Sequence, residues 1–263
     1  MSLVACRFYA WAKPFTFRTA VVRRKNNWTE RIRDLLLPNA QFIRVLTIDL
    51  PFNRDSARRG QPSDEEACHI RHLLEASRGV RHFAVSWNIW AYFPQECGSL
   101  QIESLYLMWD RALGISPPSL DQLQHPAKLE DLAVYAPPDR FNLILWREWG
   151  EYMLPSTAHY VNLAYVTYAA DRYTIPAVAD LCENPRIKAV MFVLVNIPEE
   201  IMNAEEDEML KSDVERYANF STAYLPLSSQ VLREWLAKME GKESILVHPP
   251  PHPVGVDDDE IRD

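Results

Sequence analysis

The sequence predicts an α/β fold, a solenoid in which a curved parallel sheet forms one side and helices or loops form the convex side. Two observations predict it. First, an eight-residue pattern occurs six times, with large aliphatic or aromatic residues at its first, fourth, sixth and usually eighth positions. The spacing between copies suits a strand followed by a returning helix or loop. The copies begin at Ile43, Val80, Ile102, Leu129, Leu163 and Ile187, with starts 37, 22, 27, 34 and 24 residues apart.

Each copy of the pattern has two alternating sets of positions, which point to opposite faces of a strand. We expect the fourth position, occupied by Leu46, Leu105 and Leu132 in three copies, to be buried. The third, fifth and seventh positions are expected to form an exposed concave face. Its members are Thr47, Asp49, His82, Ser86, Ser104, Tyr106, Met108, Asp131, Tyr135, Tyr165 and Thr167.

The first 25 residues are predicted to cap the N-terminal end of the repeats. Residues 2–12 have the 3.6-residue apolar period of a helix, which Pro14 is expected to end, and residues 15–22 are predicted to form a strand. A further helix should begin at Asn27, as its N-cap, and stop at Pro38. The aromatic side chains of this segment would cover the first repeat.

Helices are predicted between several copies of the pattern, within a repeat domain that spans residues 26–203. Ser63 and Glu66 have the spacing of a capping box, and Gly79 is placed for a left-handed C-terminal cap of the same helix. Further helical segments are predicted at residues 119–123, 147–154 and 175–184.

The pattern changes after the sixth copy, and residues 204–248 are predicted to form a C-terminal cap. An acidic helix at 204–219, a strand at 220–225 and a helix at 228–238 are expected. The last helix has Val231, Leu232, Trp235 and Leu236 on one face, and a repeat stack needs such a unit to cover its final layer. Residues 249–263 are too polar to order themselves and are expected to form a disordered acidic tail.

Composition restricts the class of partner. The net charge of -8 argues against nucleic acid, because phosphate binding requires clustered Lys and Arg. No apolar stretch approaches the length of a membrane span, so no membrane partner is expected. The four cysteines have no CxxC spacing, which is typical of a reducing compartment. Together these features predict a cytoplasmic or nuclear protein.

Each copy, together with the residue that follows it, resembles the leucine-rich-repeat consensus. In that consensus the ninth position is an Asn whose side chain bonds to the backbone of the turn that leaves the strand. Asn88, Asp110 and Asp171 occupy that position in three copies. Pro51, Pro137 and Val195 occupy it in the others, so a regular asparagine ladder cannot form. The repeats therefore resemble the irregular kind found in F-box substrate receptors of fungal type.

The start of the chain strengthens this resemblance. It is similar to the last helix of an F-box and the strand that follows, and the matching residues are Leu3, Val4, Cys6, Phe8 and Trp11. The earlier F-box helices, with their Leu-Pro motif, have no counterpart. The resemblance implies a ubiquitin-ligase adaptor whose Skp1-binding surface is incomplete, so Skp1 is not an expected partner.

The sequence offers little chemistry for catalysis or cofactors. Cys68, His69 and His72 lie on one predicted helix, but a zinc site needs further ligands at matched spacing, and a partly exposed helix face explains them better. Motifs for nucleophilic hydrolysis, nucleotide binding or metalloproteolysis are missing from the sequence. We therefore expect no catalytic residue, metal or cofactor.

The predicted site is a protein-binding surface on the concave sheet face. Charged pairs after three copies could form a rim beside it. A local role explains these pairs better, with each Asp capping its own turn and each Arg pairing along the surface for little energy. The candidate residues are Tyr106, Met108, Tyr135, Tyr165 and Thr167, with Asp110, Arg111, Asp139, Arg140, Asp171 and Arg172 in the rim.

These observations predict a non-catalytic domain that binds an unknown protein ligand, in the manner of a substrate receptor. An α/β enzyme with its site at the C-terminal ends of the strands remains the alternative, since alternating strands and helices also describe a doubly wound sheet. Alternating rather than continuously apolar strands disfavour it. An unattached leucine-rich-repeat scaffold differs from the first interpretation only in lacking a ligase connection.

Overall fold

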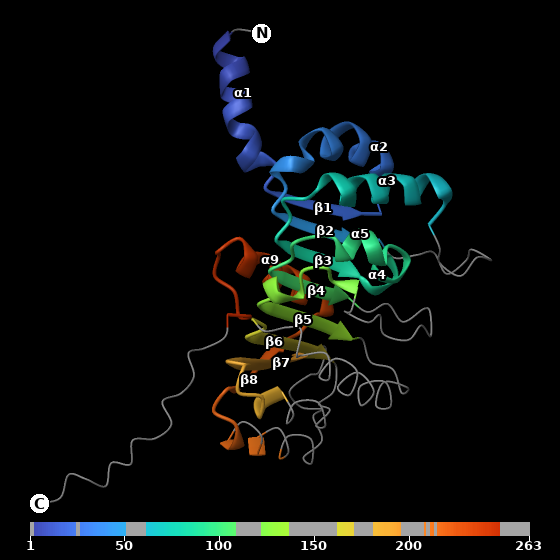
Figure 1. The fold of residues 1–263 in the computed structure, drawn as a ribbon. Coiled ribbons are helices and arrows are strands. Elements are labelled where there is room, and N and C mark those ends of the chain that lie inside the picture. The colour runs from blue at the N-terminus through green and yellow to red at the C-terminus, as the bar shows by residue number, and fades with distance from the viewer. Residues whose placement is uncertain are drawn as a thin grey trace, which may run out of the picture.

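The fold is built on one parallel sheet whose strands follow each other in chain order (Figure 1). This computed structural model describes residues 3–24, 27–50, 62–108, 122–136, 162–170, 181–195, 208, 211–212 and 215–247. Six of the described strands coincide with the six copies of the repeated pattern, and one further strand pairs at each end of this set. The strands are β1 (Thr19–Arg23), β2 (Val45–Asp49), β3 (His82–Ser86), β4 (Ser104–Met108), β5 (Asp131–Ala136), β6 (Tyr165–Ala170), β7 (Ala189–Val195) and β8 (Phe220–Leu225). The predicted α/β class is confirmed.

The two faces of the sheet are covered by different parts of the chain. One face, here the α3 face, packs against helices from the connections between strands. The other, the α9 face, packs against the C-terminal helix α9 (Ser228–Met239). The helices near the α3 face are α2 (Trp28–Arg31), η1 (Ile32–Leu36), η2 (Leu37–Phe42), α3 (Asp64–Ala76), α4 (Trp87–Tyr92) and α5 (Pro94–Gly98), and η4 (Pro126–Lys128) precedes β5.

The predicted strand register is confirmed. Leu46, Leu105 and Leu132 are at most 2% exposed and belong to the core on the α3 face. The pairing register aligns them, with Leu46 beside Phe83, Phe83 beside Leu105, and Leu105 beside Leu132. The alternation of side chains along each strand therefore places the same pattern position at the same depth in each repeat.

Helix α3 begins as predicted but ends differently. The Ser63 hydroxyl accepts a hydrogen bond from the Glu66 amide at 3.2 Å, and the Ser63 amide donates to the Glu66 carboxylate at 2.9 Å, which completes the capping box. The predicted left-handed cap at Gly79 is wrong, because the helix ends three residues earlier and Ser77 is its C-cap with φ -90°. Gly79 instead lies against the Arg44 side chain, whose Nη1 donates to the Gly79 carbonyl.

Two predicted helix ends at prolines are also wrong. Helix α1 (Leu3–Thr16) continues through Pro14. Pro38 does not stop the helical segment after Asn27, because it falls in the first turn of η2, where a missing N–H costs no intrahelical bond. Asn27 is the N-cap of α2 as expected, with φ 62° and no side-chain capping bond. The helices expected at 119–123, 147–154, 175–184 and 204–219 lie wholly or partly outside the described residues, as does the tail at 249–263.

Candidate functional site

The predicted binding surface lies on the α9 face, and helix α9 covers its centre. The pairing register aligns Tyr106 on β4 with Ala133 on β5 and Thr167 on β6. Trp235 of α9 packs on Tyr106 with 5.7 Å between ring centroids, and both rings are almost fully buried. Trp235 lies in one apolar cluster with Val231 and Leu232. These two residues belong to the predicted apolar face of the helix and are also buried.

The expectation that this face is exposed is therefore wrong. Tyr106 and Thr167 are each 1% exposed. The physical reason is that α9 is amphipathic and can remove its apolar side from water only by covering an apolar sheet surface. Besides these two, the buried members of the expected face are Thr47, Ser86, Ser104 and Asp131, and the half-buried members are Asp49, His82, Met108, Tyr135 and Tyr165.

A row of polar side chains crosses the sheet where four consecutive strands begin. The register places His82, Ser104, Asp131 and Tyr165 side by side on β3 to β6. His82 Nδ1 lies 3.1 Å from the Ser104 hydroxyl. Burial lowers the pKa of the His82 imidazole, although the neighbouring carboxylates of Glu103 and Asp131 act in the opposite direction.

Lys238 of α9 completes this row. Its ammonium donates to Asp131 Oδ2 and lies 6.0 Å from the centre of the Tyr165 ring. Burial raises the pKa of the Asp131 carboxyl above its ordinary value, and the ion pair with Lys238 counteracts the rise. Asp131 Oδ1 has no hydrogen-bond partner among the described residues. The row therefore fastens the helix to the sheet through one buried ion pair.

The row contains the residue types of a hydrolytic triad but not its arrangement. In a triad the carboxylate orients the histidine, which activates the serine. Here Ser104 lies between His82 and Asp131, and the carboxylate bonds to Lys238. The described geometry favours attachment of α9 over activation of a nucleophile.

The remaining candidate residues lie around the border of α9 or cannot be placed. Met108 and Tyr135 are neighbours across β4 and β5, and both are half-buried against the cluster that contains Trp235. Tyr165 is half-buried near Lys238. The predicted charged rim, formed by Asp110, Arg111, Asp139, Arg140, Asp171 and Arg172, lies outside the described residues.

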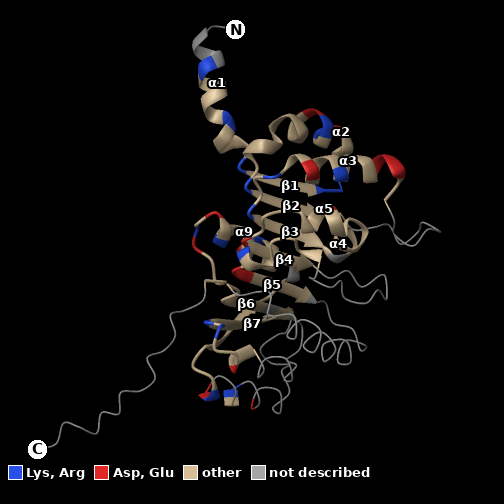
Figure 2. Cartoon of the chain, viewed as in Figure 1, with Lys and Arg blue, Asp and Glu red and all other residues tan. Residues whose placement is uncertain are grey.

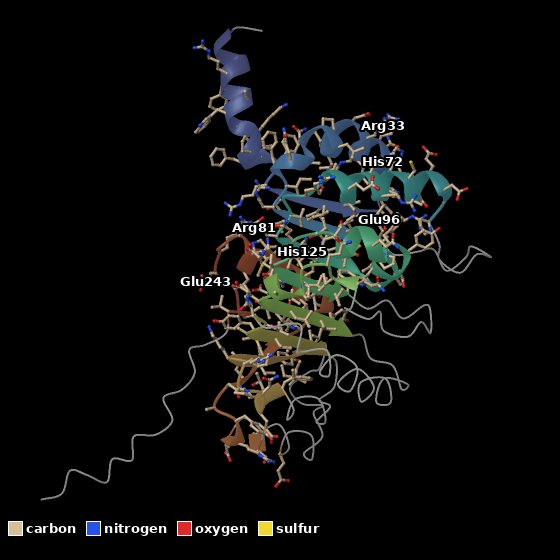
Figure 3. The ribbon with its side chains drawn as sticks, in the orientation of Figure 1. Arg33, His72, Arg81, Glu96, His125 and Glu243 are labelled. Carbon is tan, nitrogen blue, oxygen red and sulfur yellow. The ribbon has the colours of Figure 1, made fainter. Side chains whose placement is uncertain are left out.

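Helix α1 does not cover the first repeat as expected. It extends away from the sheet (Figures 1 and 3), and Phe8, Trp11 and Phe15 are each at least 64% exposed. These three rings contact one another, with centroids 5.9 Å and 5.5 Å apart. Phe17 alone of the four expected aromatic residues is buried. The apolar side of α1 thus remains largely exposed, although the helix is in contact with η2.

The cysteine and the two histidines of α3 contact side chains of the same helix. Cys68 Sγ lies 3.8 Å from His72 Nδ1, and His69 lies 3.8 Å from Glu65. His72 is exposed on the surface of the helix (Figure 3). In the part of the chain that the structure describes, there is no group of three or more residues that could hold a metal ion.

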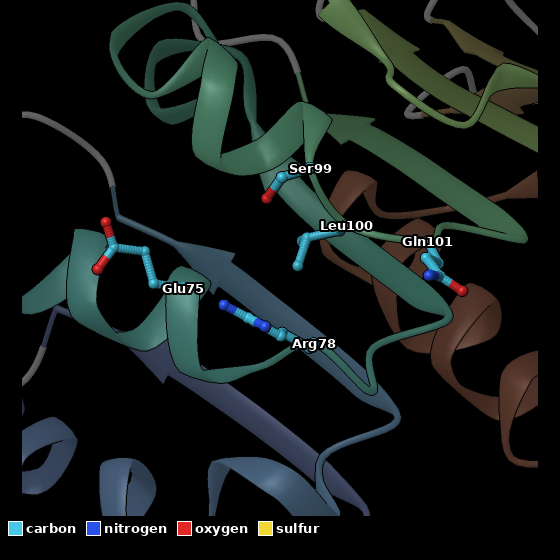
Figure 4. Close-up of a pocket in the computed structure, with 5 residues that line it drawn as sticks. All are labelled: Glu75, Arg78, Ser99, Leu100 and Gln101. Carbon is cyan, nitrogen blue, oxygen red and sulfur yellow. The ribbon is translucent and has the colours of Figure 1, made fainter.

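A small pocket of about 300 Å³ lies between the end of α3 and the segment after α5 (Figure 4). Its lining mixes one carboxylate, one guanidinium and a few small polar groups. The lining residues are Glu75, Arg78, Ser99, Leu100 and Gln101. With one carboxylate and one guanidinium as the charged groups among these lining residues, the pocket supports no particular chemistry.

Comparison with known proteins found no matching family model, no matching curated protein and no matching solved structure. Among the helices described, none has the length and apolar character needed to cross a bilayer.

Proposed function

We propose that this chain is a leucine-rich-repeat-like solenoid that binds a protein ligand on its α9 face, as a substrate receptor does. The observation that carries the proposal is the strand order, in which each of the eight described strands pairs only with the described strands next to it in chain order. Stacked repeats have this property, since each unit contacts only the units before and after it. Such stacks present extended sheet surfaces, and protein binding is their common use.

The alternative of a doubly wound enzyme receives no support from the topology. In doubly wound sheets, ligands bind where the strand order reverses and adjacent connections cross to opposite faces. The described strands run from β1 to β8 without a reversal. An enzyme would therefore need a site of a different kind, and the row around Ser104 lacks the geometry for one.

The proposed ligand surface is the part of the α9 face that borders the helix. Met108, Tyr135 and Tyr165 remain partly accessible there, and Tyr and Met are enriched in protein contacts. Asp49 and His82 extend the surface toward β2 and β3. We further propose that the protein acts in the cytoplasm or nucleus. Nucleic acid is not its proposed partner, because a net charge of -8 is unfavourable for phosphate binding. Whether ubiquitin transfer follows depends on the ligase connection.

The experiment compares the partners of three versions of the full chain by quantitative affinity purification. The double variant Met108→Ser, Tyr135→Ser should lose at least one partner that the unsubstituted chain captures reproducibly. The matched control is Tyr224→Ser on β8, which removes a 43% exposed ring and should keep every partner, because Tyr224 aligns with Leu194 of the α3-face core and so lies on the face opposite the proposed surface. Melting temperatures of all three proteins separate lost binding from lost folding. A partner set that does not differ among them would contradict the proposal.

A further inference from the structure

A pocket of about 180 Å³ lies at the edge of the sheet where strands β2 to β5 begin. Its walls come from the segments that lead into these four strands. Basic residues come directly before β1, β2 and β3 along this edge (Figure 2). The charged and amide side chains that line this strand-entry pocket belong to Arg44, Arg78, Arg81, Gln101, Glu103 and Lys128.

The strand-entry pocket contains more cations than carboxylates. Four of its lining residues are basic, and Glu103 is the acidic one. Glu103 is paired with Arg81, with 3.0 Å between their charged atoms. In the part of the chain that the structure describes, Arg44, Arg78 and Lys128 have no ion pair with a carboxylate. The local charge is therefore positive, although the whole chain has a net charge of -8.

The Arg44 guanidinium is held in the pocket wall by neutral backbone groups. Its Nη1 donates to the Gly79 carbonyl at 3.0 Å, and to the carbonyls of Gln41 and Ile43 at 3.3 Å and 3.4 Å. Gly79 permits this position, because a Cβ there would lie 1.8 Å from Arg44 Nη1. One nitrogen makes all three bonds, so Nε and Nη2 are left to donate to another acceptor.

Lys128 is held in a similar way by an uncharged partner. Its ammonium donates to the amide oxygen of Gln101 and has two further N–H donors. Arg78 lies at the border with the neighbouring pocket, which contains the carboxylate of Glu75, and lines both pockets (Figure 4). The two cations that are fixed without a counter-charge are therefore Arg44 and Lys128, which come from the segments before β2 and β5.

The size and charge of the pocket select one class of ligand group. Its volume is below the roughly 300–1,000 Å³ of sites that enclose a whole ligand, so it suits a terminal group. A phosphate monoester carries a charge of about -1.5 to -2 at neutral pH and has three acceptor oxygens, whereas a carboxylate carries one charge. The monoester therefore balances the unpaired cations better. A long polyanion is disfavoured by the net charge of the chain.

We propose that the strand-entry pocket binds the phosphate of a phosphomonoester, whose oxygens accept hydrogen bonds from Arg44 and Lys128. Arg78 adds attraction at the border of the pocket, and Arg81 remains paired with Glu103 and neutralises it. A phosphorylated metabolite and a phosphoserine side chain of a protein present the same group, and the test separates these two sources. This inference does not depend on the proposed ligand surface of the α9 face.

The test titrates the full chain by isothermal titration calorimetry with glycerol 3-phosphate and with a phosphoserine peptide. The control peptide has glutamate in place of phosphoserine and should bind at least about fivefold more weakly than the better phosphorylated probe. Lys128→Gln should weaken binding of that probe at least about fivefold. Lys188→Gln should change it less than about twofold, because Lys188 is exposed before β7 and lies outside the pocket.

A second variant, Gly79→Ala, keeps every charge of the protein. Its added Cβ would displace the Arg44 guanidinium, so phosphate binding should weaken at least about threefold. The melting temperature of each variant separates lost binding from lost folding. A folded Gly79→Ala protein with unchanged affinity would overturn the proposal.

The remaining outcomes either assign the source of the phosphate or contradict its binding. Binding of glycerol 3-phosphate alone would support a metabolite, binding of the peptide alone would support a phosphoprotein, and binding of both would support recognition of the phosphate group itself. The proposal would be overturned if neither phosphorylated probe bound, or if the glutamate peptide bound equally well. Equal effects of the Lys128 and Lys188 substitutions would also overturn it, because they would show general charge attraction.

Discussion

Lys238 and Asp131 form an ion pair that joins helix α9 to strand β5, although 107 residues separate them in the chain. Both side chains are largely shielded from water, with 16% and 8% of their surface exposed. Taking two charges out of water is costly unless each finds its partner. The position of α9 on the sheet, and hence the extent of the proposed ligand surface, depends on this pair together with Trp235.

Lys238→Met should lower the free energy of unfolding by about 3–5 kcal/mol, because it leaves a buried carboxylate without its cation. Chemical denaturation measures the loss. Lys242→Met is the matched control, since Lys242 is 69% exposed and its pair with Glu240 lies at the surface, and its effect should stay within about 1 kcal/mol. Equal losses for the two variants would mean that the buried pair has no special role.

The loss of unfolding free energy caused by Lys238→Met should depend on pH. Burial raises the pKa of Asp131 and Lys238 lowers it, so removing Lys238 raises that pKa further. A raised folded-state pKa means that stability is present at low pH and lost as pH rises through that pKa. The deficit relative to the unsubstituted protein should thus be greatest above the pKa that Asp131 has in the variant, and it should shrink as pH falls through that pKa. Urea titrations at several pH values test this, and a deficit independent of pH would contradict it.

Trp235→Ala should cost about 3–5 kcal/mol of unfolding free energy, because it removes a fully buried aromatic ring from the cluster over Tyr106. Arg233→Ala, on the exposed side of the same helix, should change stability little. Tyr106→Ala should also lower the melting temperature by several degrees, as expected of a core residue. A Tyr106→Ala protein with unchanged melting temperature would argue that α9 leaves the sheet in solution.

Phe17→Ala should destabilise the protein by about 3 kcal/mol, whereas Phe15→Ala should have an effect below about 0.5 kcal/mol. Phe17 is 8% exposed and Phe15 is 68% exposed, so only the first loses buried contacts. Thermal or chemical denaturation of the two variants compares them directly. Similar losses would indicate that α1 packs against another surface in solution.

Gly98→Ala should destabilise the protein by roughly 1–3 kcal/mol, because the added Cβ would lie 2.0 Å from the backbone carbonyl oxygen of Gln122. That carbonyl belongs to a segment held by a bond from the Gln124 amide to the Gly98 carbonyl. Gly79→Ala is the control, since its added Cβ would meet the end of the flexible Arg44 side chain. The loss for Gly98 should exceed that for Gly79 in urea denaturation.

Much of the local structure was predictable from the sequence because its causes are local. The burial of Leu46, Leu105 and Leu132 follows from the two-residue period of strands, and the start of α3 follows from the Ser63 and Glu66 side chains, which bond within one turn. The amphipathic face of α9 was predictable for the same reason. Proline positions predicted the ends of helices poorly, because a proline such as Pro38 can begin a helical turn as well as end one.

The outcome for the candidate site depended on contacts between distant segments. The alternation of side chains along a strand is enough to place Tyr106, Met108, Tyr135 and Tyr165 on one side of the sheet. The apolar periodicity of α9 is enough to show that this helix needs an apolar surface to cover. That Trp235 covers Tyr106 and that Phe15 remains exposed became known only from the folded arrangement of distant segments, because an apolar face specifies burial but not the surface that provides it.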